Sequence, residues 1–428
     1  MNFYFKTLGC KVNQYETQAM KEALIKLGHT ANIGSPPDAV VINSCTVTAE
    51  SDRKTRQILR QLKRQYENAV IVLTGCMVQA FPEKAKLLDD ADIIIGNRDV
   101  TAVVNAINTY NNGKIFEICS HEPDDNYVSL PISDFSERTR AFMKIEDGCN
   151  RYCTYCIIPK ARGYVRSRPL EDIKKEAEAL AKNGYLEIVL VGINLSAYGQ
   201  GTEYNIGDAV NAVSSVEGIK RVRLGSLEPD HITDDILLRL KNNKKFCEQF
   251  HLSLQSGCDE TLKRMNRHYD TAFYYDLVTR IRNIFPNAAI TTDIMVGFPD
   301  ESKEEFNKSI DFVKKVGFAR SHIFAYSRRG GTVADGLPNQ ISNHIKQQRA
   351  KIMADVTANS EKEFLASQSG KVLPVLFETS KSGLQTGYTG NYLKVCINTA
   401  TNLTGQILPV RITRTFNSFC SGEIVNKE

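Results

Sequence analysis

Three cysteines lie close together in the segment Cys149-Asn-Arg-Tyr-Cys153-Thr-Tyr-Cys156, and we call them the loop triad. A four-iron cluster held wholly by protein takes four thiolates. Three cysteines would leave one iron open, which is what a catalytic metal centre requires. The Cys153–Cys156 spacing also suits zinc, but zinc needs a fourth ligand that the neighbouring residues do not offer. The loop triad therefore predicts a [4Fe-4S] cluster with one open position.

A second set of cysteines, the sheet triad, consists of Cys10, Cys45 and Cys76, each at the end of a candidate strand. The carboxyl ends of parallel strands meet at one edge of a sheet, where ligand sites form. Cysteine is also common in buried sheets for packing reasons alone. Three cysteines at equivalent strand ends favour convergence, and we predict a second cluster there.

The remaining cysteines, Cys119, Cys247, Cys258, Cys396 and Cys420, have no such context and are interpreted as packing or surface positions. Eleven cysteines in a chain without an export signal argue against a disulfide framework and for a reducing compartment. The apolar runs have strand length, far below a membrane span. We expect a cytoplasmic protein with no membrane segment.

Basic residues gather in two stretches that contain no acid, although the formal net charge is only +5. Such stretches suit a polyanionic partner, whereas the commoner explanation of a basic run is a solvated helix face. The first stretch holds Arg53, Lys54, Arg56, Arg60, Lys63 and Arg64, and the second holds Arg151, Lys160, Arg162, Arg166 and Arg168.

The elements that must position the sheet triad alternate between strand and helix. Strands are expected at Phe3–Leu8, Ala39–Asn43, Val70–Thr74 and Asp92–Gly96. Asn13 and Glu16 predict a capping box for a helix that Gly28 ends, and a basic helix is expected over 51–66. This pattern predicts a doubly wound α/β domain over residues 1–118, followed by a linker at 119–138 that is rich in Ser, Pro and Asp.

A longer strand–helix alternation over residues 139–369 must position the loop triad. Its six expected strands predict a partial TIM-type (β/α)6 barrel, with the loop triad directly after the first strand. They are Ala141–Glu146, Glu187–Gly192, Arg221–Gly225, Phe250–Leu254, Ala289–Val296 and Ser321–Ala325. Residues 370–428 contain short strands separated by Gly and Asn, and predict a small all-β barrel.

The loop triad and the motifs at the later strand ends resemble the radical-SAM superfamily. These motifs are Val191-Gly-Ile-Asn194, Ser226-Leu-Glu228, Gln255-Ser256, Thr292-Asp-Ile-Met-Val-Gly-Phe-Pro299 and Phe324-Ala-Tyr326. The resemblance implies an S-adenosylmethionine pocket. In it Arg267 would meet the carboxylate of the cofactor and Tyr155 would pack on its adenine. Its other expected contacts are Gly192, Asn194, Ser226, Glu228, Gln255, Asp293 and Tyr326.

Further motifs, which span the chain, resemble the methylthiotransferases of that superfamily. They include Thr7-Leu-Gly-Cys-Lys-Val-Asn-Gln-Tyr-Glu-Thr17, Asn43-Ser-Cys-Thr-Val-Thr48, Thr74-Gly-Cys-Met-Val-Gln79 and Ile157-Ile-Pro-Lys-Ala-Arg-Gly-Tyr-Val-Arg-Ser-Arg168. Among these enzymes the chain looks most like those that act on threonylcarbamoyl-adenosine in tRNA. The resemblance implies two [4Fe-4S] clusters, radical cleavage of S-adenosyl-L-methionine at the loop triad, and sulfur transfer from the cluster of the sheet triad.

The same resemblance implies a tRNA anticodon stem-loop as partner and an electron donor such as flavodoxin or ferredoxin, and leaves the sulfur source open. The C-terminal barrel would be an RNA-binding TRAM domain, with Tyr388, Tyr392, Arg411 and Arg414 as contacts, unless the tyrosines pack the barrel. The expected reaction is methylthiolation at carbon 2 of threonylcarbamoyl-adenosine. Cations at positions 160, 162, 166 and 168 would meet its carboxylate or, alternatively, tRNA phosphates.

Three other functions are alternatives for the same residues. The chain is expected to act on an isopentenyl-adenosine tRNA or on a ribosomal-protein aspartate if the substrate assignment fails. A non-enzymatic iron–sulfur RNA-binding sensor is the alternative of another class. Formation of 5′-deoxyadenosine distinguishes the enzymes from the sensor.

Overall fold

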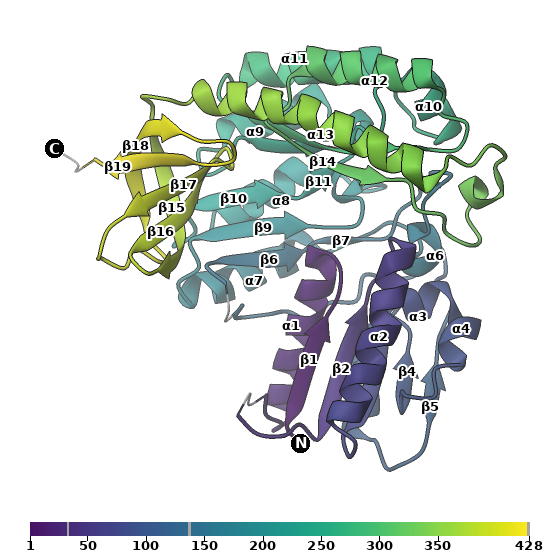
Figure 1. The fold of residues 1–428 in the computed structure, drawn as a ribbon. Coiled ribbons are helices and arrows are strands. Elements are labelled where there is room, and N and C mark those ends of the chain that lie inside the picture. Colours follow the sequence, from purple (N-terminus) through teal and green to yellow (C-terminus); the bar gives the residue numbers. More distant parts are fainter. Residues whose placement is uncertain (32–33, 136–137, 426–428) are drawn as a thin grey trace.

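The computed structural model of this chain describes residues 1–31, 34–135 and 138–425. Residues 136–137, at the end of the predicted linker, and 426–428, at the end of the predicted C-terminal barrel, lie outside the described residues. The N-terminal sheet lies below a larger α/β barrel, and a small β-barrel lies at one side (Figure 1). None of the helices in the described ranges is long and apolar enough to cross a membrane.

The N-terminal part is a five-stranded parallel sheet in the order β1-β2-β3-β4-β5. Its strands are β1 (Phe3–Thr7), β2 (Ala39–Ser44), β3 (Val70–Gly75), β4 (Ile93–Ile95) and β5 (Ile115–Glu117). Its helices are α1 (Lys11–Lys26), α2 (Ala49–Gln65), α3 (Cys76–Ala80), α4 (Pro82–Lys86) and α5 (Val100–Asn108). Strand β5 escaped the sequence analysis because it is three residues long and mostly exposed.

Side chains alternate between the two faces of this sheet, and helices cover both faces. In β2, Val40 and Ile42 pack toward α2, whereas Ala39 and Val41 pack toward α1 and α5. The strand order runs consecutively along the sheet and never reverses. In this respect the domain differs from the predicted doubly wound arrangement, whose strand order reverses at a switch point.

The predicted linker is packed against both neighbouring parts where the structure describes it. Ile132 and Phe135 are buried in the core of the α/β barrel. The Glu22 carboxylate of α1 accepts hydrogen bonds from the backbone nitrogens of Ser133 and Asp134, at 2.8 and 3.0 Å. The segment therefore helps to hold the N-terminal part against the barrel.

The α/β barrel has six main parallel strands, as predicted. They are β6 (Arg140–Lys144), β9 (Glu187–Val191), β10 (Arg221–Leu224), β12 (Gln249–Leu252), β13 (Ala289–Val296) and β14 (Arg320–Ala325). They form the sheets β10-β9-β6 and β11-β12-β13-β14, and an isolated bridge joins Val222 of β10 to Phe246, which precedes β12. The short strands are β7 (Glu146–Asp147), β8 (Arg166–Ser167) and β11 (Ser226–Leu227).

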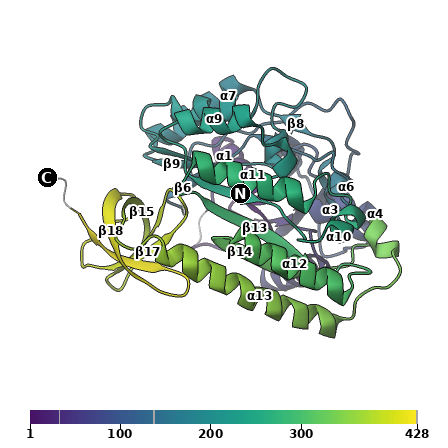
Figure 2. The ribbon, with the colours of Figure 1, turned by 90° about the horizontal axis from the view of Figure 1, so that it is seen from above.

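Most helices of this part lie on the outer side of the barrel strands, and the first, a short one, packs against α3 of the N-terminal part. The helices are α6 (Ile158–Arg162), α7 (Leu170–Lys182), α8 (Ile206–Ser214), α9 (Asp234–Asn242), α10 (Asp259–Arg264), α11 (Thr271–Ile284), α12 (Lys303–Val316) and α13 (Asn343–Ala366). Three 3-10 turns occupy Leu195–Ala197, Pro229–His231 and Val333–Gly336. The long helix α13 runs beside β14 toward the C-terminal barrel (Figure 2).

The C-terminal part is a closed barrel with the strand order β15-β16-β17-β19-β18. Its strands are β15 (Val372–Lys381), β16 (Leu384–Thr389), β17 (Lys394–Asn398), β18 (Ile407–Thr415) and β19 (Cys420–Ile424). No apolar alternation marks β16 in the sequence, because its buried positions carry Gln385, Gly387 and Thr389. A Cβ at Gly387 would stand 2.4 Å from the carbonyl oxygen of Leu376, so close strand approach requires glycine there.

Candidate active site

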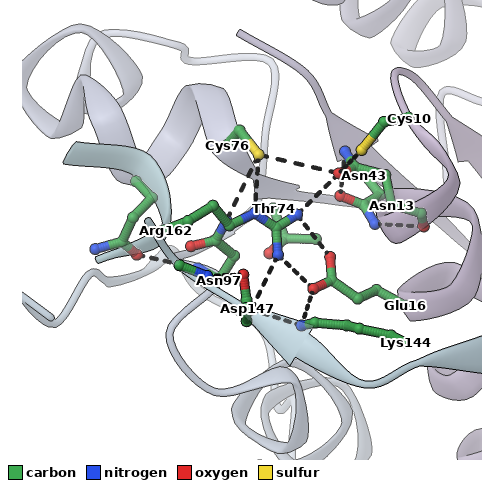
Figure 3. A network of polar contacts seen from close by, with 12 residues as sticks. Cys10, Asn13, Glu16, Asn43, Thr74, Cys76, Asn97, Lys144, Asp147 and Arg162 are labelled. Carbon is green, nitrogen blue, oxygen red and sulfur yellow. Dashed lines mark hydrogen bonds and ion pairs between the residues drawn. The ribbon is translucent and has the colours of Figure 1, made fainter. Parts of the chain in front are cut away.

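The sheet triad lies at the edge of the N-terminal sheet where β1, β2 and β3 end. Cys10 caps α1, Cys45 follows β2, and Cys76 begins α3. The sulfurs of Cys10 and Cys76 lie 3.7 and 3.9 Å from the same Asn13 Oδ1 (Figure 3). A Cβ added at Gly9 would stand 3.0 Å from the Cys45 sulfur, which therefore borders the backbone next to Cys10. The fold thus brings the three cysteines together.

The surroundings of the sheet triad favour neutral thiols unless positive charge joins them. Burial raises the pKa of Cys76 to about 12 although the charge of Arg162 opposes it, and the neighbouring thiols of Cys10 and Cys45 add to the rise. Burial also raises the pKa of Cys10, although Arg162 opposes it. Iron would supply the positive charge that lets the thiolates form together, so this donor set fits a cluster. Within the described residues, no group of three or more His, Cys, Asp or Glu side chains is arranged to hold a single metal ion.

Asn13 and Glu16 do not form the predicted capping box. Helix α1 begins before Asn13, and both side chains are buried. Asn13 Nδ2 donates to the carbonyl oxygens of Leu8 and Ser44 at 2.9 and 2.8 Å, which ties together the segments that follow β1 and β2. The Glu16 carboxylate points to the α/β barrel and accepts from Lys144 Nζ at 2.7 Å. The two side chains therefore frame the site.

The loop triad follows β7 at the carboxyl end of the barrel's first strand. Gly148 has a φ of +84°, and a Cβ there would stand 1.8 Å from the carbonyl oxygen of Tyr164, so the turn into the triad requires glycine. Burial raises the pKa of Cys149 and of Cys156 to about 12 each, and the neighbouring Cys153 thiol adds to both rises. This donor set, like the sheet triad, fits a cationic cluster.

Arg267 lies against the loop triad. Its Nη1 donates to the Cys153 sulfur at 3.2 Å, and its Nη2 forms an ion pair with Glu228 and donates to the Tyr269 hydroxyl at 2.8 Å. The guanidinium that was predicted to meet the cofactor carboxylate thus pairs with Glu228, another predicted cofactor contact. Tyr155 lies beside this pair, with its hydroxyl 3.4 Å from Nη1 of Arg267.

Several predicted cofactor contacts leave polar atoms without a partner at the barrel mouth. Asn194 Oδ1, Gln255 Oε1 and the Tyr326 hydroxyl are buried, and none has a hydrogen-bond partner within the described parts of the chain. Buried polar atoms are normally satisfied, so these atoms fit a polar ligand. Ser226 is exposed at its strand end, and the Asp293 carboxylate lies 3.2 Å from His251 Nε2.

Comparisons with known proteins agree with this geometry. Residues 143–313 match the Radical SAM superfamily, and residues 2–96 match a family described as Uncharacterized protein family UPF0004. The chain is 35% identical to threonylcarbamoyladenosine tRNA methylthiotransferase MtaB of Bacillus subtilis, over 98% of this chain and 96% of that protein. The chain belongs to the radical-SAM tRNA methylthiotransferases. It is therefore a sulfur-transferring enzyme of a tRNA-modifying family.

Two further relatives show the breadth of the methylthiotransferases. MtaB of Thermotoga maritima is 36% identical over 91% of this chain and 89% of its own length. A tRNA-2-methylthio-N(6)-dimethylallyladenosine synthase of Clostridium perfringens is 35% identical over 99% of this chain and 97% of its own. The structure of the radical S-adenosylmethionine methyltransferase TsrM from Kitasatospora setae has a TM-score of 0.54 at 14% identity, covering 90% of this chain and 81% of its own, and shares the fold.

Glu146 of this methylthiotransferase is a site residue that the sequence analysis missed. It is fully buried, and burial together with the nearby Asp147 raises its pKa well above the ordinary range. Its Oε2 accepts from the Asn194 backbone nitrogen at 2.7 Å, and a Cβ at Gly192 would stand 2.5 Å from that oxygen. An acid at the end of a predicted strand, three residues before Cys149, was the signal that could have revealed it.

The prediction that the arginines after the loop triad meet substrate or phosphate is wrong for Arg162, Arg166 and Arg168. All three are buried. Arg162 forms ion pairs with Glu16 and Asp147, Arg166 lies 3.6 Å from Asp147, and Arg168 forms an ion pair of 2.8 Å with Glu176. Each guanidinium is held by carboxylates of the protein itself, because a buried charge needs a partner. Arg162 and Arg168 also join the two α/β parts, because they contact Glu16 and Tyr15 of α1.

Lys160 differs from those arginines, because it is exposed. It lines a cavity of about 560 Å³ together with Cys153 and Cys156, and its Nζ lies 5.4 Å from the centre of the Phe81 ring. It therefore keeps a cation near the loop triad.

Tyr388 and Tyr392 were predicted as RNA contacts, and the structure instead places them against the α/β barrel. Their rings stack at 4.9 Å, and the Arg140 guanidinium lies 5.2 and 5.4 Å from the two ring centres. Arg223 lies 4.9 Å from the Tyr392 ring. The tyrosines thus belong to the joint between barrels, whereas the side chains at 411 and 414 on β18 are exposed.

Proposed function

We propose that this methylthiotransferase adds a methylthio group to carbon 2 of threonylcarbamoyl-adenosine next to the anticodon of tRNA. S-adenosyl-L-methionine and a [4Fe-4S] cluster on each triad would supply the radical and sulfur-transfer chemistry when bound. Four relatives named MtaB, 35–36% identical over 88–99% of this chain, support the nucleoside. In the domain division that we propose, residues 1–118 hold the sheet triad, 139–369 the loop triad, and 370–428 an RNA-binding barrel.

The proposal rests on one observation, which is that residues beside the two triads pack in the same apolar cluster. Cys76 of the sheet triad packs in one apolar cluster with Ile157, which directly follows Cys156 of the loop triad, and with Ala161 of α6. Two reactive centres that act on one substrate must lie close together, because the substrate has to meet both. The packing of α3 against α6 gives this proximity.

Roles for the pocket residues follow from their positions. The unpartnered oxygens of Asn194 and Gln255 would accept hydrogen bonds from the amino group or ribose of S-adenosylmethionine. The buried Tyr326, in the cluster that also contains Phe298 and Tyr155, would close the apolar side of the site and exclude water. Exposed arginines on β18 support RNA binding by the C-terminal barrel, with phosphate contacts that weaken as salt rises.

Lys160 is the residue that we propose for recognition of the threonylcarbamoyl carboxylate. A carboxylate that leaves water needs a cation or hydrogen-bond donors, whereas a dimethylallyl group needs neither. A dimethylallyladenosine synthase is 35% identical to this chain, so the dimethylallyl-modified adenosine is the competing substrate assignment. Sequence identity over the chain does not distinguish the two substrates, so an assay has to distinguish them.

The experiment compares two anticodon stem-loops that differ only in this modification. We expect wild type to prefer the threonylcarbamoyl stem-loop. Lys160→Ala should lower kcat/KM for the threonylcarbamoyl stem-loop about tenfold, because a charge-assisted hydrogen bond contributes about 1.5 kcal/mol. The same variant should leave kcat/KM for the dimethylallyl stem-loop unchanged. Lys84→Ala is the matched control, because Lys84 is also exposed and also lies over the Phe81 ring, at 4.7 Å. Preference of the wild type for the dimethylallyl stem-loop would overturn the assignment.

A further inference from the structure

One buried arginine of the α/β barrel reaches the sheet triad of the N-terminal part. Arg162 ends α6, is fully buried, and its Nε donates to the Cys76 sulfur at 3.2 Å (Figure 3). Its Nη2 donates at 2.8 Å to Asn13 Oδ1, the oxygen that also lies near the Cys10 sulfur. A side chain from one part of the chain thus completes the wall around cysteines of the other.

Carboxylates from both parts fix the direction in which this guanidinium points. Glu16 of α1 receives hydrogen bonds from both Nη1 and Nη2, the latter at 2.9 Å. Asp147 of β7 lies 3.4 Å from Nη1. A two-pronged contact with a carboxylate holds a guanidinium in one plane, which is what aims Nε at the sulfur.

The charges around Arg162 do not cancel. Lys144 Nζ lies 2.7 Å from Glu16 and 2.6 Å from Asp147, and Arg166 lies 3.6 Å from Asp147. Arg162 and Lys144 each contact both carboxylates. In these contacts the three cations outnumber the two carboxylates beside the sheet triad.

We propose that Arg162 is a positioning residue for the cluster of the sheet triad, whose reduced form it stabilises through its hydrogen bond and charge at the Cys76 thiolate. The potential of an iron–sulfur cluster depends on nearby charge and on hydrogen bonds to its sulfurs, and a cation favours the more negative, reduced form. The reduction potential of the cluster on the sheet triad then depends on the contact between the N-terminal part and the barrel that holds the loop triad. This inference rests on the proposed function, in which the sheet triad binds a cluster.

A matched control exists in the same segment. Arg168 is also buried and also joins the two parts, because it pairs with Glu176 at 2.8 Å and donates to the Tyr15 hydroxyl of α1 at 3.3 Å. None of the hydrogen bonds of Arg168 in the described residues goes to a cysteine. Arg168→Gln therefore removes a comparable buried cation without touching the triad.

The experiment uses the full chain with the loop triad replaced by Ala, reconstituted with iron and sulfide, so that the cluster of the sheet triad is observed by itself. Iron content and the midpoint potential from an EPR redox titration are measured. In Arg162→Gln we expect about a tenfold fall in the ratio of reduced to oxidised cluster at a fixed potential, which is 59 mV for a one-electron couple. Arg162→Lys should restore part of the shift, and Arg168→Gln should show none.

The results separate this inference from the proposed function. A parent chain that binds no iron would overturn both. Full iron in Arg162→Gln with an unchanged potential would overturn the role of Arg162 alone, as would an equal shift or an equal loss of iron in Arg168→Gln. Loss of iron in Arg162→Gln that Arg162→Lys restores, with Arg168→Gln loaded normally, would support the role.

Discussion

Removal of Arg223 should undo the joint between the α/β barrel and the C-terminal barrel. Arg223 of β10 is buried, its Nε donates to Glu187 Oε1 at 2.8 Å, and its other nitrogens donate to the carbonyl oxygens of Thr389 and Gly390 at 3.0 and 2.9 Å. Arg223→Ala would leave two carbonyls without these donors and weaken the neutralisation of a fully buried carboxylate. The carboxylate keeps more distant partners, because Arg221 lies 3.5 Å from it.

The size of the effect follows from burial. Breaking a buried ion pair from one side costs about 3–5 kcal/mol, a large share of a typical unfolding free energy of about 5–15 kcal/mol. Arg239 is the control, because it is exposed and pairs with Asp208 and Asp235 on the surface. Arg239→Ala should lower the unfolding free energy by less than about 1 kcal/mol.

Urea unfolding of the apo protein, followed by circular dichroism, measures both variants. Limited proteolysis should also release the C-terminal barrel sooner in Arg223→Ala. A double-mutant cycle with Glu187→Gln should give a coupling energy of at least about 1 kcal/mol, since the two side chains are in direct contact. A loss below about 1 kcal/mol in Arg223→Ala, or equal losses in Arg223→Ala and Arg239→Ala, would refute this reasoning.

Three further predictions concern the site. Replacing the loop triad by Ala should leave about half of the reconstituted iron, as expected for two [4Fe-4S] clusters, and abolish 5′-deoxyadenosine; normal cleavage would contradict the assignment. Replacing the sheet triad by Ala should preserve some cleavage and stop methylthiolation, so accumulating methylthio product would show these cysteines to be structural. Burial raises the pKa of Glu146 in the fold, so the apo protein should lose stability as pH rises from the ordinary carboxyl pKa toward the raised one. Glu146→Gln should remove that loss, and thermal unfolding with the same pH slope in both proteins would refute it.

Local pattern and strand order predicted much of this architecture. The six barrel strands follow from apolar runs between helices, and the convergence of Cys10, Cys45 and Cys76 follows from their place after parallel strands. These features depend on short-range periodicity and on the geometry that any parallel sheet imposes.

Long-range pairing was beyond the sequence. A run such as Arg162 to Arg168 is the same whether its cations face RNA or carboxylates. Glu16, the partner of Arg162, lies far away in the chain, and Glu176, the partner of Arg168, lies on the following helix. The same holds for Tyr388 and Tyr392, whose arginine neighbours come from β6 and β10. Burial of a charge is decided by tertiary packing, which local composition does not report.

The most direct test of the proposed function is nucleoside mass spectrometry of tRNA from cells with and without this protein. The account predicts that 2-methylthio-threonylcarbamoyl-adenosine disappears without the protein and that its unmodified precursor accumulates. Wild type should restore the modification, whereas the variant without the sheet triad should not. Loss of a methylthio-dimethylallyl nucleoside instead, with the threonylcarbamoyl nucleosides unchanged, would contradict the account.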